Sequence, residues 1–283
     1  MIYALIAFGY SLTFSTSRTI NFSLGNLLML GGVVGFSLAV DMASGQSLGR
    51  PFLVPLIGVL IAGTLAGSLV YKTAVQPSLR TKTDFTWVLA TLAFGIILKN
   101  AVEQIWSTGD FRLPSPLGDS VVHLGSIGFY PQEVLIIIVS LLLMTAVELI
   151  RSKTIWGKAV QAVSEDPATA SLMGINPQGV VHLAYILSAV IAAIGGLLIA
   201  PLTFVSASMG TAIGIKAYAA AIIGGLESGL GIVVGGLILG LGEVFTARYL
   251  STGYKDTPGF VLLILIILVR PSGLFGRTKA KKV

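Results

Sequence analysis

The 283 residues are 54% hydrophobic and only 11% charged, whereas an average soluble domain carries about 25% charged residues. Together with a mean hydropathy of +0.91, this composition excludes a soluble protein. It indicates an all-α polytopic membrane protein, because helices satisfy their own backbone groups in lipid. The absence of cysteine excludes a disulfide framework, a thiolate nucleophile and a cysteine metal site. The net charge of +6 follows the loops, so membrane topology explains it better than nucleic-acid binding.

Eight segments are apolar and long enough for membrane helices, which need ~20 residues when tilted, and an additional Gly-rich segment at about 212–226 could span or re-enter. In chain order they cover about 2–17, 22–40, 52–71, 85–105, 133–150, 178–199, 212–226, 229–248 and 257–270. No basic region precedes the first segment, so we expect a membrane span there and not a cleaved leader. The 34 glycines and 11 prolines predict tight helix packing with some short or re-entrant segments. We therefore expect one transmembrane domain over residues 1–283, with nine helices in a range of eight to ten.

Basic residues predict the orientation of these helices. They concentrate in four regions, which contain Arg18; Lys72, Arg80 and Lys82; Arg151, Lys153 and Lys158; and the tail at about 271–283 with the preceding Arg270. The positive-inside rule places all four regions in the cytoplasm. Nine crossings then follow, because the amino terminus lies outside and the carboxyl terminus inside, and the Gly-rich segment 212–226 must cross. The loop 106–132 is expected outside.

The most distinctive segment is a polar island inside the cytoplasmic loop at about 151–177. Asp166 followed by Pro167 is typical of a helix start, and Gly174 is placed where a left-handed residue would end that helix. Asn176 and the proline after it repeat the start signal for the next span. The loop is therefore expected to carry a short, rigid helix. Such a helix can pass motion to a soluble partner, although an ordered loop without a partner is the alternative.

The side chains of this loop helix have distinct expected roles. Glu165 and Asp166 lie at its start, where carboxylates suit the positive end of the helix dipole. Leu172 and Met173 are the apolar anchors expected to dock into a partner. The small residues that would allow close approach are Ala168, Thr169 and Ala170.

Polar residues within spans mark candidate transport sites, because their burial in lipid is costly. The Gly-rich segments 21–32 and 214–225 are expected to line a path, with Asn21, Ser23, Asn26 and Lys216 as its polar contributors. Glycine at these places also serves helix packing, which is the competing interpretation.

Other polar residues have structural explanations. Lys99 and Glu103 are spaced to pair on one helix face. Glu243 and Arg248 are expected near the outer end of a span, where they reach water, and no deep charged pair is expected. Neither His123 nor the interfacial His182 lies in a zinc or hydrolase motif, so the sequence indicates no catalytic residue and no metal site.

Four motifs in order resemble one family. They are INFSLGNLLMLGG, GKAVQAVSEDPATASLMGIN, GIKAYAAAIIGGLESGLGIVVGGLILGLGEVF and YKDTPGFVLLILIILVRPSGLFG. Over nearly its whole length the chain resembles the permease subunits of branched-chain amino acid ABC importers. The resemblance implies inward transport without enzymatic activity in this chain, in the inner membrane of a prokaryote. It implies a second permease subunit, two cytoplasmic ATP-binding subunits that carry ATP and Mg, and an extracytoplasmic solute-binding protein. The 157–176 loop corresponds to the family's coupling region.

The chain departs from the family pattern at two places. Ser23, Leu24, Gly25 and Asn26 stand where the family commonly has Ala-His-Gly-Glu, and in GLESGLG Glu227 and Leu230 replace a glycine and a proline. Selectivity is therefore expected to lie mainly in the solute-binding protein. A branched-chain amino acid is the leading substrate, with amides, urea and aromatic acids as alternatives. A self-sufficient secondary carrier or channel is the competing function; it would work without an ATPase.

Overall fold

The computed structural model describes residues 1–41, 48–80, 85–106, 109–118, 120–124 and 127–276. The helices, in chain order, are α1 (Ile2–Ser17), α2 (Leu24–Ala39), α3 (Leu53–Val70), the π-helical turn η1 (Tyr71–Val75), α4 (Gln76–Arg80), α5 (Thr86–Trp106), α6 (Pro131–Lys153), α7 (Ile155–Glu165), α8 (Pro167–Leu172), α9 (Pro177–Ile199), α10 (Met209–Gly224), α11 (Gly229–Tyr249), the 3₁₀ turn η2 (Thr252–Tyr254) and α12 (Thr257–Val269). The strands β1 (Val122–Leu124) and β2 (Ile127–Phe129) form an antiparallel hairpin. Lys82 and the basic tail beyond residue 276 lie outside the described residues.

Each of the nine segments predicted from hydropathy is helical in the structure. Among the described residues, six stretches are long and apolar enough to cross a membrane: Leu53–Leu79, α5, α6, α9, α11 and Thr252–Val269. The apolar helices α2 and α10 have only 16 residues each, or about 24 Å, which is shorter than the ~30 Å hydrocarbon core. The all-α polytopic class is therefore confirmed, and short apolar helices are among its elements.

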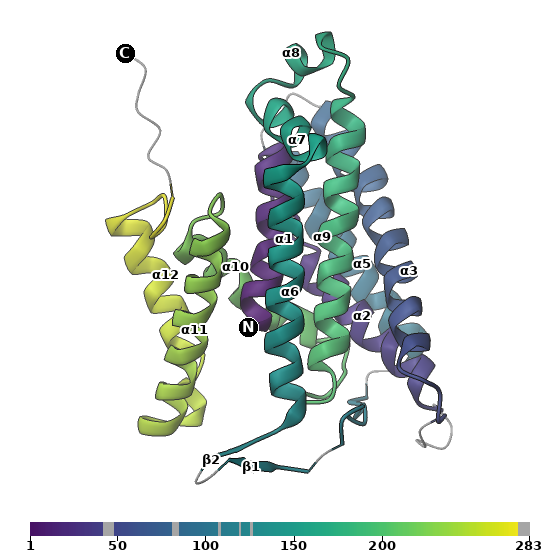
Figure 1. Cartoon of the computed structure of the whole chain (residues 1–283), viewed down its shortest axis with the longest axis vertical. Coiled ribbons are helices and arrows are strands. Elements are labelled where there is room, and N and C mark those ends of the chain that lie inside the picture. The colour runs from purple at the N-terminus through teal and green to yellow at the C-terminus, as the bar shows by residue number, and fades with distance from the viewer. Residues whose placement is uncertain (42–47, 81–84, 107–108, 119, 125–126, 277–283) are drawn as a thin grey trace.

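The helices connect two opposite ends of the bundle (Figure 1). One end carries α7, α8 and the turn between α10 and α11, where Glu227 forms an ion pair with Arg18. The other end carries the β1–β2 hairpin, and there Val205 pairs with Phe111 through backbone hydrogen bonds. Because Val205 precedes α10 and Glu227 follows it, α10 connects the two ends. The loop at 106–132, whose hairpin the sequence did not predict, lies opposite the basic loop at 151–177.

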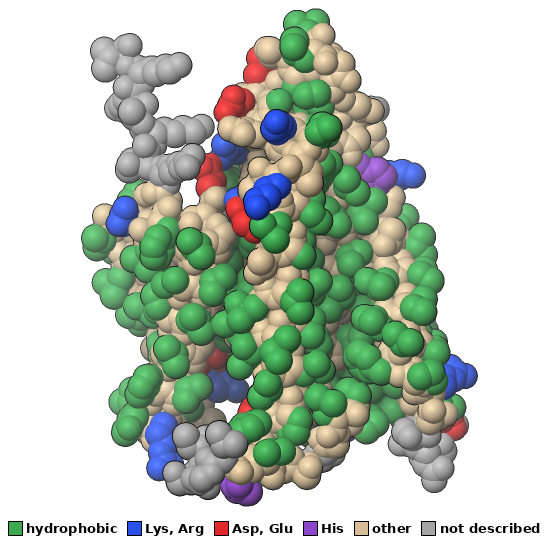
Figure 2. All heavy atoms as spheres, viewed as in Figure 1, with side chains coloured by type: hydrophobic (Ala, Val, Ile, Leu, Met, Phe, Trp, Pro, Cys, Tyr) green, Lys and Arg blue, Asp and Glu red, His purple; other side chains and the backbone are tan. Residues whose placement is uncertain are grey.

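The surface fits a membrane environment along its length. Figure 2 shows hydrophobic side chains over the long faces of the bundle, with most charged side chains near its ends. Most of α9 is buried, whereas less than a quarter of the most apolar part of α5, of α6 and of Thr252–Val269 is buried. Exposed apolar side chains at this density are costly in water and suit contact with lipid.

The short helix α2 lies at the centre of the bundle because glycine lets other backbones touch it. A Cβ at Gly31 would overlap the carbonyl oxygen of Ala193 on α9, and a Cβ at Gly196 would overlap the carbonyl oxygen of Leu28. A Cβ at Gly25 would overlap the carbonyl oxygen of Gly210 on α10. Small residues at helix crossings allow this close approach in lipid, where dispersion contacts replace the hydrophobic effect.

The backbone contact at Gly31 predicts a large, local cost for any side chain there. Gly31→Val should destabilise the protein by about 1–3 kcal/mol, the usual cost of overpacking. Gly240→Val is the matched control, because Gly240 is also inside a helix and a Cβ there meets no atom within 4 Å. The measurement is the midpoint of thermal unfolding in detergent. Equal midpoints for the two variants would contradict the contact.

Candidate functional site

The loop at 151–177 contains two helices, of which the sequence predicted one. The unpredicted helix α7 is capped by Thr154, whose side chain accepts a hydrogen bond from Gly157 N, 3.4 Å away. It buries Val160 and Val163, and it packs against α1, α6 and α9. The spacing of these valines is the amphipathic signal that could have revealed α7. Helix α7 therefore fixes the base of the loop on the bundle.

The second helix, α8, has the caps that the sequence predicted. Asp166 accepts a hydrogen bond from Ala168 N at 2.9 Å, and Gly174 has a φ of 82°. Ile175 N donates to Ala170 O across the helix end at 3.1 Å, as in a left-handed helix termination. Hydrogen bonds from the Thr169 hydroxyl and from backbone N–H groups lower the pKa of Asp166, so the cap stays ionised at neutral pH. Asn176 caps α9 through Gly179 N.

The apolar tip of α8 points into solvent. Leu172 is 88% exposed and Met173 is 78% exposed, although both are apolar. Glu165, Asp166 and Pro167 are also exposed. Helix α8 thus projects from the end of the bundle (Figure 1). We call residues 165–174 the α8 knob; Leu172 and Met173 form its apolar tip, and Glu165 and Asp166 its acidic base.

Two details of the knob differ from expectation. Glu165 is the last residue of α7 and not part of the first turn of α8, so Asp166 alone caps the helix. Ala170 is 3% exposed, because it faces back into the loop, and cannot contact a partner. The small exposed residues left for close approach are Ala168 and Thr169.

A break between α1 and α2 forms the second candidate site. Residues 18–23 return into the bundle beside the second half of α1, and Leu24 at the start of α2 lies against Gly9 in the middle of α1. The N-terminus of α2 therefore lies inside the bundle, about midway between its ends. No side chain in the described residues caps it. Its first N–H groups carry the positive end of the helix dipole.

The predicted path residues Asn21, Ser23 and Asn26 come together at this break. Asn21 is fully buried, and its Oδ1 accepts hydrogen bonds from Ser23 N at 3.2 Å and from Ser23 Oγ at 2.6 Å. Asn26 lies next to Ser23, because a Cβ added to Gly95 on α5 would meet both the side-chain nitrogen of Asn26 and the Cα of Ser23. Asn21 Nδ2 and Asn26 Oδ1 are buried without a hydrogen-bond partner in the described part of the chain.

Lys216, the fourth predicted path residue, belongs to a different cluster. Its Nζ lies 2.6 Å from Asp256 Oδ1 and 2.8 Å from Glu243 Oε1. The Tyr3 hydroxyl donates to Glu243 Oε2 at 2.8 Å, so the cluster joins α10 to α1, α11 and the start of α12. Gly214, two residues before Lys216, instead contacts α2. The cluster therefore lies on a different face of α10 from the break.

This cluster corrects two expectations from the sequence. Glu243 does not extend freely into water at the end of α11; its side chain is 14% exposed and is paired with Lys216. A charged pair therefore lies partly buried between helices, contrary to prediction, although the second carboxylate of the cluster, that of Asp256, is 48% exposed. The predicted pair of Lys99 and Glu103 on α5 is confirmed, with a separation of 3.6 Å.

Breaking the partly buried pair of Lys216 and Glu243 should destabilise the protein. Lys216→Met leaves the Glu243 carboxylate without its cation. Breaking a fully buried pair costs about 3–5 kcal/mol, so this partly buried pair should cost less than that but more than an exposed pair. Adding Glu243→Gln should recover much of the loss, because the remaining group is neutral. Lys99→Met is the control, since exposed pairs contribute about 0–1 kcal/mol. Thermal unfolding in detergent measures all three, and equal effects of Lys216→Met and Lys99→Met would contradict a structural role for the cluster.

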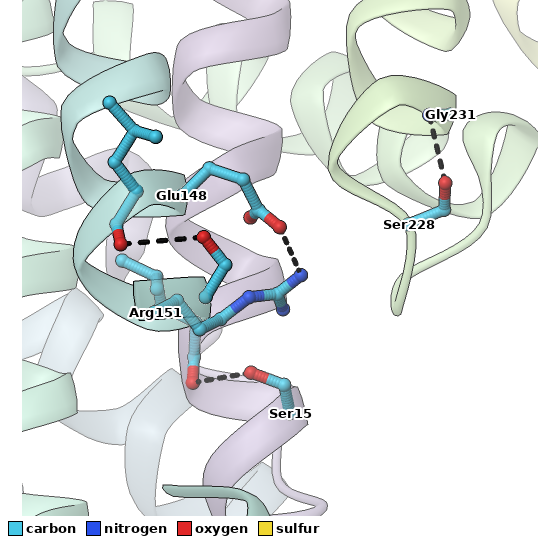
Figure 3. Close-up of polar contacts among 8 residues, drawn as sticks. Ser15, Glu148, Arg151, Ser228 and Gly231 are labelled. Carbon is cyan, nitrogen blue, oxygen red and sulfur yellow. Dashed lines mark hydrogen bonds and ion pairs between the residues drawn. The ribbon is translucent and has the colours of Figure 1, made fainter. Parts of the chain in front are cut away.

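A cleft opens at the end of the bundle that carries the knob. Its cavity of about 680 Å³ is lined by Phe8, Glu148 and Arg151 on one side and by Ser228 and Gly229 on the other. Figure 3 shows Arg151 pointing to Glu148 on α6, with a distance of 2.9 Å between Nη2 and Oε1, and Ser228 accepting from Gly231 N at 3.1 Å. Ser228 thereby caps the N-terminus of α11. It lies in the GLESGLG turn between α10 and α11.

The fold and these sites define a class: a polytopic helical membrane protein with a capped helix projecting from one end and a broken helix inside. Residues 1–270 match the family model described as "Branched-chain amino acid transport system / permease component". The high-affinity branched-chain amino acid transport system permease protein LivH of Escherichia coli K12 is 33% identical over 99% of this chain and 93% of its own. The corresponding protein BraD of Pseudomonas aeruginosa is 30% identical over 99% and 94%.

A more distant relative is the galactofuranose transporter permease protein YtfT of Escherichia coli K12, which is 28% identical over 70% of this chain and 52% of its own. No solved structure matches the chain. The family match and the LivH alignment both cover nearly the whole sequence. The chain belongs to the permease component family of branched-chain amino acid transport systems, and its role is that of a transporter permease subunit.

Proposed function

We propose that this chain forms the translocation path of an ABC importer that carries a branched-chain amino acid inward, driven by ATP hydrolysis on partner subunits. The family supports the transport role, and the printed names of LivH and BraD support the substrate. The observation that carries the coupling role is the α8 knob, because an exposed apolar tip held by two caps is suited to a protein partner. ATP and Mg bind to the partner chains.

The proposed assembly contains a second permease subunit, two cytoplasmic ATP-binding subunits and an extracytoplasmic solute-binding protein, in a prokaryotic inner membrane. The knob end is proposed to face the cytoplasm, since Arg18, Arg151 and Lys153 flank the helices there. The positive-inside rule supports this orientation. It gives nine crossings, an outer amino terminus and an inner carboxyl terminus.

The knob is proposed to dock into a groove on an ATP-binding subunit. Leu172 and Met173 would fill an apolar pocket there, and the acidic residues Glu165 and Asp166 favour basic side chains at its rim. Gly174 and Pro167 fix the direction of the helix, so movement of the groove would be passed through α8 to α7 and from there to α1, α6 and α9, which α7 contacts. Because both ends of α8 are fixed by caps, the helix would pass movement of the groove to α7 without bending.

The translocation path is proposed to include the α2 break, with Asn21, Ser23 and Asn26 as polar contributors. Discontinuous helices near the membrane midplane are the usual place for transporter substrate sites. Lys216, by contrast, is proposed to hold α10 to α11 and α12, because both of its carboxylate partners lie on those elements.

Leu172→Asp tests the coupling role. A carboxylate at the tip would have to be buried in the partner's pocket, so we expect ATP hydrolysis to become uncoupled from uptake while the chain remains in the membrane. The measurement is ATP-driven solute uptake and solute-stimulated ATP hydrolysis in proteoliposomes that contain all subunits. Leu172→Met is the matched control, because it keeps the apolar contact. Normal coupling in Leu172→Asp would overturn the docking assignment.

A further inference from the structure

The cleft between α6 and α11, which we call the α6–α11 cleft, combines apolar walls with charged groups. Its cavity of about 680 Å³ lies within the ~300–1,000 Å³ typical of ligand sites. Its apolar walls include Phe8, Leu141, Met144, Leu230, Val233 and Phe275. Its charged lining residues are Glu148, Arg151 and Glu227. The cleft is therefore suited to a ligand that has both an apolar part and a charged part.

The cleft opens on the apolar outer surface of the bundle. Leu141 is 40% exposed and Leu230 is 79% exposed, although both line the cavity. Only 22% of the most apolar part of α6 is buried. The lining comes mainly from α1, α6 and α11, whereas the α2 break lies against α5. The cleft is thus a separate site from the proposed path, and it faces the lipid.

The depth of the apolar wall matches one leaflet of a bilayer. Between Leu141 and Arg151, helix α6 rises about 15 Å, which is half of the ~30 Å hydrocarbon core. Arg151 and Lys153 lie in the last turn of α6, at the level where basic side chains reach the headgroups. An acyl chain can therefore lie along this wall with its headgroup beside Arg151.

The charged groups leave an acceptor and several donors free for a headgroup. Arg151 Nη2 donates to Glu148 Oε1 at 2.9 Å, which uses one of the five N–H donors of a guanidinium. Glu148 Oε2 is buried and has no hydrogen-bond partner in the described part of the chain. It points across the cleft towards α11, because a Cβ at Gly229 would lie 3.2 Å from it (Figure 3).

The charges around the cleft also balance. Arg151 pairs with Glu148, and Arg18 pairs with Glu227. Two cations facing two carboxylates give no preference for a ligand with a net negative charge. The free groups instead suit a headgroup that offers a phosphate to the guanidinium and N–H donors to the carboxylate.

We propose that the α6–α11 cleft binds a phospholipid with a phosphoethanolamine headgroup. Its ammonium would donate to Glu148 Oε2, its phosphate would lie against Arg151, and an acyl chain would follow the wall of α6. Phosphocholine has no N–H donor and leaves the Glu148 oxygen unpaired, and phosphoglycerol has no cation for it. The bound lipid would bridge α6 and α11. This site goes beyond the transport function and does not depend on the solute carried.

Native mass spectrometry of the full-length chain in a mild detergent tests the headgroup. Mixed with equal amounts of phosphatidylethanolamine, phosphatidylcholine and phosphatidylglycerol of the same acyl chains, the chain should retain the first several-fold more than the others. Glu148→Gln should abolish the preference for phosphatidylethanolamine over phosphatidylcholine, because an amide cannot balance the ammonium charge. Glu103→Gln is the matched control, since that carboxylate also pairs with a basic residue of its own helix but lies on α5.

Filling the cleft tests its position. Thr145 lines the cavity and is exposed, so Thr145→Trp should lower the amount of phosphatidylethanolamine retained several-fold. Thr64→Trp is the control, because Thr64 is exposed on α3. Equal retention of the three lipids, a preference for phosphatidylglycerol, or an unchanged preference in Glu148→Gln overturns the proposal. So does a Thr145→Trp variant that retains lipid normally but no longer co-purifies with the second permease subunit, because a protein would then cover the cleft.

Discussion

Direct backbone contact between α2 and its neighbours is the constraint on which the rest of the structure depends. Gly25, Gly31 and Gly196 each occupy a crossing where a Cβ would overlap a carbonyl oxygen. With α2 held this deeply, its 16 residues cannot reach from one end of the bundle to the other. The chain must then enter the interior as an irregular segment, which is tolerated in membranes only where protein buries it. The α2 break follows from this packing.

The same geometry separates the proposed functions in space. Contact with the ATPase is assigned to the α8 knob, whose caps and exposed Leu172 depend on local sequence alone. Substrate contact is assigned to the interior break, where Asn21 Nδ2 and Asn26 Oδ1 lack hydrogen-bond partners among the described residues. Between them, α7 contacts α1 and α9, the two helices that flank the break and pack on α2. A tilt of the knob can therefore reach the break through directly packed helices.

Sequence alone could predict the features that depend on near neighbours or on hydropathy. The spans, the caps at Asp166 and Asn176, and the left-handed Gly174 were all predicted, because each signal lies within a few residues. Helix α7 was missed because its polar residues outweighed the spacing of its valines. The pairing of Lys216 with Glu243 could not be predicted, since it requires knowledge of which faces of α10 and α11 meet. Asn21, Ser23 and Asn26 were predicted as polar path residues, but the covering of their site by α5 is a tertiary property.

The central claim is that this permease moves solute only as part of an ATP-driven assembly. The most direct measurement is uptake of labelled leucine into proteoliposomes that contain the chain with its partner permease, the ATP-binding subunits and the solute-binding protein. The account predicts uptake that requires ATP on the side of the membrane where the ATP-binding subunits lie. Uptake should stop when any one subunit is omitted. Uptake by the chain alone, driven by a proton or sodium gradient, would contradict it.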